Sequence, residues 1–85
     1  MNRTEEIARV VNTVAAAYGE TQRDIAHTIG VDPATITRRL RQGTGSWTAE
    51  DLEALAAHYD VPTGTFLRPL AEVRDALIAR YLSAA

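Results

Sequence analysis

The sequence predicts an all-α fold of five to six helices. Apolar residues recur every three or four positions along most of the chain, which is the spacing of a helix with one buried face. Residues that favour helix starts precede these stretches, and glycine or proline follows them, as Thr21 and Gly30 do around the second stretch. Such short helices are not stable alone, so we expect them to cover one another in a single core.

Composition narrows the class of protein. The chain has 85 residues, of which 46% are hydrophobic and 24% charged, a balance typical of a soluble globular domain. It contains no cysteine, no signal-peptide pattern and no apolar run near the ~20 residues of a membrane span. We therefore expect a cytoplasmic protein. The net charge of −2 argues against indiscriminate nucleic-acid binding but leaves room for a local basic face.

The first helix is expected over residues 2–18. Asn2 and Glu5 suit its N-terminal cap, and Gly19 suits its end. One face collects its apolar residues, which are Ile7, Val10, Val11, Val14, Ala15 and Tyr18. This face is expected to cover the next two helices.

Two short helices joined by a tight turn are expected within residues 21–43. Thr21 and Asp24 form a capping-box pair at the start of the first, and Gly30 ends it in a conformation that glycine tolerates. Asp32 caps the second, which opens on a proline. Two helices with a connection this short are typical of a helix-turn-helix, whose second helix enters the major groove of DNA.

The second helix of the pair, residues 33–41, carries a basic outer face. When Ile36 and Leu40 face the core, the opposite face presents Ala34, Arg38 and Arg41, flanked by Thr35 and Thr37. No acidic residue occurs between Asp32 and Glu50, so three arginines lie together in a chain that is acidic overall.

A fourth helix is expected after Trp47. Thr48 is its N-cap, Asp51 is the reciprocal acid, and Trp47 is expected to pack against Leu52 as a hydrophobic staple. Its buried stripe comprises Leu52, Leu55, Ala56 and Tyr59, and Pro62 ends it.

The remaining chain holds one helical turn and a last helix. Phe66 and Leu67 are expected to insert into the core from the turn, and Pro69 restarts the chain. The last helix, within residues 69–85, has apolar residues at helical spacing: Leu70, Val73, Leu77, Ile78 and Tyr81. We expect these residues to form a dimerisation face; the alternative is that the helix packs within its own chain and the protein is monomeric.

The stretch from Thr21 to Leu67 resembles the phage-repressor, Cro-like helix-turn-helix family that also includes the xenobiotic-response-element regulators. The matching segments are TQRDIA, IGVD, TITRRL and LEALAAHYDVP. The resemblance implies a lambda-repressor-like DNA-binding domain over residues 1–68, with the helix-turn-helix as its second and third helices. The sequence departs from the family at Arg39, where an apolar residue is usual, and Leu40 takes the inward position.

Residue chemistry and the resemblance together predict a DNA-binding surface. Base reading is assigned to Ala34, Thr35, Thr37 and Arg38, with Arg38 placed to bond O6 and N7 of guanine. Phosphate positioning is assigned to Thr21, Gln22, Arg23, Arg39, Arg41, Thr44 and Ser46. The assignment of Gln22, including a buttressing contact to the recognition helix, is what the resemblance implies.

Simpler interpretations stay open for several of these residues. Arg38 could be an ordinary surface charge, Arg39 a solvated or salt-bridged side chain, and Arg41 a partner of the helix dipole. His27 and His58 have no partner at ligand spacing, so we expect ordinary histidines and no metal or other cofactor.

The predicted function is a sequence-specific DNA-binding transcriptional regulator, a repressor that binds a near-palindromic operator as a homodimer. The chain shows no recognisable nucleophile with its base, so we do not expect an enzyme. Two alternatives keep the same fold. One is a protein-interaction module without DNA binding, and the other is an antitoxin that binds its own promoter while its last helix holds a protein partner, the toxin.

Overall fold

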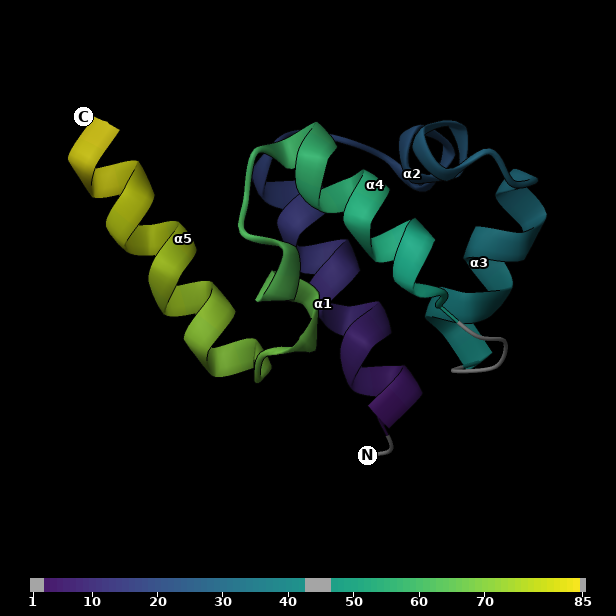
Figure 1. The fold of residues 1–85 in the computed structure, drawn as a ribbon, viewed down its shortest axis with the longest axis horizontal. Helices are drawn as coiled ribbons and strands as arrows, with labels where there is room; N and C mark the ends of the chain where they lie inside the picture. Colours follow the sequence, from purple (N-terminus) through teal and green to yellow (C-terminus); the bar gives the residue numbers. More distant parts are fainter. Residues whose placement is uncertain (1–2, 43–46, 85) are drawn as a thin grey trace.

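The computed structural model describes residues 3–42 and 47–84, and all of its regular elements are helical (Figure 1). They are α1 (Arg3–Ala17), α2 (Gln22–Ile29), α3 (Pro33–Gln42), α4 (Ala49–Tyr59), the 3-10 helix η1 (Thr63–Leu67) and α5 (Leu70–Ala84). The predicted all-α class is therefore confirmed for the described part of the chain. Asn2, the predicted cap of the first helix, and residue 43, the last position of the predicted helical pair, lie outside it.

One apolar core joins all six elements. Its fully enclosed side chains come from every helix: Val10, Val11 and Val14 from α1, Ile25 from α2, Ile36 from α3, Leu55 from α4, Phe66 from η1 and Val73 from α5. Because Val73 belongs to this core, α5 packs on the same core as the preceding helices.

Two capping boxes fix the starts of α2 and α4. The Thr21 N–H donates to Oδ2 of Asp24 at 2.8 Å, and the Asp24 N–H donates back to the Thr21 hydroxyl at 3.3 Å. Thr48 and Asp51 exchange the same pair of bonds at 3.2 and 3.0 Å. Both boxes were predicted from sequence, and both are confirmed.

Three residues connect α2 to α3. Gly30 has φ 74° and ψ 33°, a left-handed conformation, and its N–H donates to carbonyls of the last turn of α2. The Val31 N–H donates to the Ala26 carbonyl at 3.0 Å, and the Asp32 carbonyl accepts from the N–H of Thr35 at 2.9 Å. The connection thus pairs orphan carbonyls at the end of α2 and orphan N–H groups at the start of α3.

Two residues predicted to face the core are exposed instead. Tyr18 is 43% exposed, because α1 ends at Ala17 and the chain then turns through Gly19 in a left-handed conformation. Leu67 is 47% exposed, whereas its neighbour Phe66 is buried. Adjacent residues of one short helix point in different directions, so only one of this pair reaches the core.

The basic helix and the last helix lie at opposite ends of the molecule. Figure 1 shows α2 and α3 at one end of the longest axis and α5 at the other, with α1 and α4 between them. α1 packs against both α3 and α5. None of the described helices is long and apolar enough to cross a membrane.

Candidate functional site

The outer face of α3 forms an open hollow. Ala34, Thr37, Arg38 and Arg41 line it, and its volume is about 690 Å³. These four residues include two arginines and no acid, so the hollow favours an anionic ligand. Ile36 points the other way and is fully buried, as the sequence predicted.

α2 braces α3 next to this hollow. The Thr37 hydroxyl donates to Oε1 of Gln22 at 2.8 Å and also lies 3.1 Å from the Pro33 carbonyl. The hydroxyl is therefore turned toward α2 and the helix backbone. This hydrogen bond joins Gln22, which was assigned to phosphate, to Thr37, which was assigned to bases.

The two outward arginines differ from the third arginine of α3 in exposure. Arg38 and Arg41 are exposed, and Nη2 of Arg38 lies 3.4 Å from the hydroxyl of half-buried Thr35. Among the described contacts of the Arg38 guanidinium, there is thus one hydrogen bond, and it is long. Its position suits a reach toward a ligand beyond the surface.

Arg39 has a different environment. Its Nη1 lies 3.2 Å from Oδ2 of Asp51, and its guanidinium carbon lies 5.1 Å from the ring centre of Trp47. The Arg39 side chain is only 14% exposed. The salt-bridged alternative raised for Arg39 matches this geometry, and its guanidinium is not presented to solvent as those of Arg38 and Arg41 are.

Two residues assigned to phosphate at the start of α2, Thr21 and Arg23, have different environments. The Thr21 hydroxyl donates to Oδ2 of Asp24 at 3.0 Å and works as the helix cap. Hydrogen bonds from the Thr21 N–H and then from its hydroxyl hold the pKa of Asp24 below its usual value. Arg23 is exposed beside them. Thr44 and Ser46 lie outside the described residues.

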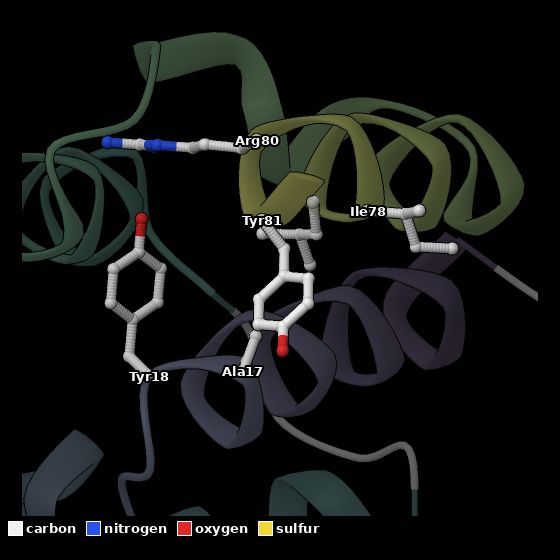
Figure 2. Close-up of a pocket in the computed structure, with 6 residues that line it drawn as sticks. Ala17, Tyr18, Ile78, Arg80 and Tyr81 are labelled. Atoms are coloured by element: carbon white, nitrogen blue, oxygen red, sulfur yellow. The ribbon is translucent and has the colours of Figure 1, made fainter. Parts of the chain in front are cut away.

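A second, apolar hollow lies between the end of α1 and α5 (Figure 2). It measures about 450 Å³ and is lined by Ala17, Tyr18, Leu77, Ile78, Arg80 and Tyr81. Figure 2 shows Tyr18 and Ala17 on the α1 side, Tyr81 extending from α5 toward Ala17, and Arg80 extending from α5 above Tyr18. The Arg80 guanidinium lies 6.0 Å from the Tyr18 ring centre and closes one edge.

The predicted dimerisation residues do not share one environment. Val73 is buried in the core, so the assignment of Val73 to a dimer face is corrected: α5 needs this side chain to pack on α1. Leu70 and Leu77 are half-buried against the same core. Ile78 and Tyr81 are 58% and 75% exposed, and Leu82, which was not predicted, is 66% exposed.

A polar cluster that sequence reasoning missed joins the α1–α2 connection to the end of α4. Oε2 of Glu20 lies 2.9 Å from Nε2 of His58, and the Tyr59 hydroxyl donates to Oε1 of Glu20 at 2.9 Å. Burial first, and the bond to Glu20 second, raise the pKa of the Tyr59 hydroxyl. The partners lie 38 and 39 positions apart, so no local spacing announces them.

Within residues 3–42 and 47–84, no cluster of three or more histidine, aspartate or glutamate side chains could hold a metal ion. Comparison of the chain with protein-family models, curated proteins and solved structures found no match.

Proposed function

We propose that the protein is a sequence-specific double-stranded DNA-binding regulator of the Cro-like helix-turn-helix type, acting as a cytoplasmic transcriptional repressor. In this proposal α2 and α3 form the helix-turn-helix, and the 33–41 segment of α3 lies in the major groove. The observation that carries the proposal is the outer face of α3, where Arg38 and Arg41 line an open hollow free of acidic residues.

The geometry of the α2–α3 pair supports this role. In the three-residue connection the N–H groups of Gly30 and Val31 donate to α2 and the Asp32 carbonyl accepts from α3, and Gln22 braces α3 through Thr37. A reading helix must be held rigidly, because base contacts depend on donor positions within a few tenths of an ångström. In this proposal Arg38, which is exposed, reads guanine, and the exposed Arg41 and Arg23 bind phosphate.

The exposed apolar face of α5 supports a homodimer. Ile78, Tyr81 and Leu82 follow one another at helical spacing on one face, and the apolar hollow of about 450 Å³ beside Tyr18 adjoins this face. A two-fold interface pairs one patch with itself, so a second copy needs no other surface. The two reading helices would then contact half-sites about 34 Å apart on a near-palindromic operator.

In-vitro selection of the purified chain against a random duplex library tests the proposal. We expect an enriched near-palindrome whose half-site spacing reports the dimer geometry. An enriched single half-site would keep the DNA-binding function and reject the dimer. No enrichment at low salt, with the chain shown to be folded, would reject the function itself.

A protein-binding role is the second candidate, and the apolar hollow at α5 is the observation that favours it. This candidate covers the protein-interaction module without DNA binding and the antitoxin, which also binds its own promoter. Salt dependence separates the module from the first candidate, since a DNA binder with several phosphate contacts loses orders of magnitude in affinity between about 50 and 200 mM salt. Co-purification of a protein partner on the last helix distinguishes the antitoxin.

A further inference from the structure

Three side chains tie the basic helix to α4, and we call them the Arg39 cluster: Arg39 of α3, Asp51 of α4, and Trp47 just before α4. The guanidinium of Arg39 pairs with Oδ2 of Asp51 at 3.2 Å and stacks on Trp47 at 5.1 Å from the ring centre. The two charged side chains are 14% and 15% exposed. The pair is therefore shielded from solvent far more than an ordinary surface ion pair.

One carboxylate oxygen serves two purposes in this cluster. Oδ2 of Asp51 accepts the N–H of Thr48 at 3.2 Å, which completes the cap of α4, and it also accepts the Arg39 guanidinium. The cap of α4 and the anchor of α3 thus share an atom. α3 packs closely on α1 and α2, and the Arg39 cluster adds a contact to α4 on a further side.

We propose that Arg39 is a positioning residue that fixes the rotation of α3, and that it does not contact DNA phosphate. The inference rests on the proposed function of α3 as the reading helix. Adjacent residues of a helix differ by about 100° in direction. Holding Arg39 toward α4 therefore holds Arg38 toward the hollow. The half-buried Arg39 thus determines the direction of the exposed Arg38.

Conservative variants distinguish positioning from phosphate binding. Lysine keeps the positive charge but lacks the planar guanidinium that stacks and pairs at once. We expect Arg39→Lys to lower affinity for the selected duplex about tenfold, as expected when a base contact is misplaced, and to leave affinity for a scrambled duplex nearly unchanged. A phosphate contact would accept either cation, so binding by Arg39→Lys within about twofold of the parent chain would contradict the positioning role. The matched control is Arg74→Lys, at an exposed arginine of α5 away from the hollow, which should leave both affinities unchanged.

The salt dependence of duplex affinity provides the result that would overturn the positioning role of Arg39. The slope of log affinity against log salt falls by about 0.9 for each phosphate contact that is lost. We expect Arg39→Ala to leave this slope unchanged and Arg41→Ala to reduce it. A reduced slope for Arg39→Ala, together with normal binding by Arg39→Lys, would overturn the proposal.

A second measurement needs no DNA. Arg39→Gln, Asp51→Asn and the double variant are unfolded in urea, with Trp47, the single tryptophan of the chain, as the fluorescent reporter. We expect the midpoint shifts of the two single variants not to add in the double variant, because both remove one interaction. Glu50→Gln, a neighbouring exposed acid of the same helical turn, is the matched control and should shift the midpoint little.

The two measurements separate the two proposals. Additive midpoint shifts would overturn the role of Arg39 even in a chain that binds its duplex tightly. Non-additive shifts in a chain that enriches no duplex would instead overturn the proposed function and leave the contact between α3 and α4 standing.

Discussion

Replacing Arg38 with alanine is the most direct test of the proposal that the outer face of α3 reads DNA bases. The Arg38 side chain is exposed, and its described polar contact is one long hydrogen bond to Thr35 at 3.4 Å. Its removal therefore costs little folding stability, within about 0.5 kcal/mol. A bidentate contact to guanine contributes about 1–3 kcal/mol of discrimination, which corresponds to a roughly 5- to 150-fold loss of affinity.

The assay is fluorescence anisotropy with the selected duplex and with duplexes substituted at each position of the half-site. We expect the loss at one base pair, with the Arg38→Ala variant no longer distinguishing the bases there. Arg74→Ala, an exposed arginine of α5 at the other end of the molecule, controls for the change of net charge. An equal loss across all duplexes would make Arg38 a phosphate contact, and no loss would refute the reading face described above.

Three further predictions concern the fold. Phe66→Ala should lower the free energy of unfolding by about 3–5 kcal/mol, because the side chain is fully enclosed, whereas Leu67→Ala, on the exposed neighbour, should lower it far less; equal losses in urea titrations would contradict the core. Gly30→Ala should cost about 1 kcal/mol because φ is 74°, while Gly64→Ala, in open space without a positive φ, should be near neutral in thermal melts. The folded-state pKa of Tyr59 lies above the unfolded value of 10.0, so the contribution of Tyr59 to folding stability should be fully present below pH 10 and should be lost as the pH rises above it. Tyr59→Phe should abolish this loss of stability at alkaline pH. A loss that persists in Tyr59→Phe would come from other groups.

The elements that local chemistry specifies were predictable. A capping box needs only residues three positions apart, so Thr21 with Asp24 and Thr48 with Asp51 are visible in the sequence and present in the structure. The left-handed turn at Gly30 belongs to the same class, because the conformation restricts the residue type. The outward direction of Arg38 followed from the helical period once Ile36 was assigned to the core.

The remaining features depend on partners far along the chain. Helical periodicity placed Tyr18 on the buried face, but it carries no information on where α1 ends. Tyr18 lies one residue beyond that end, so its side chain no longer follows the helical period. Val73 satisfies the pattern of a dimer face and of a core face equally well, and the packing of α5 on α1 decides between them. The contact of Arg39 with Asp51 spans 12 positions and joins two different helices, so the helical spacing that identified α3 could not reveal it.

Four consecutive residues of α3 account for its four sides. Ile36 enters the core, the Thr37 hydroxyl donates to Gln22 of α2, Arg38 points to solvent and Arg39 pairs with α4. At about 100° per residue these directions divide the circumference of the helix nearly evenly. A rotation of α3 would have to break a buried apolar contact, a hydrogen bond and a shielded ion pair together. The identical side chains of Arg38 and Arg39 therefore lie in opposite environments one step apart along the helix, and the proposed ligand-facing role falls to the side of α3 that points to solvent.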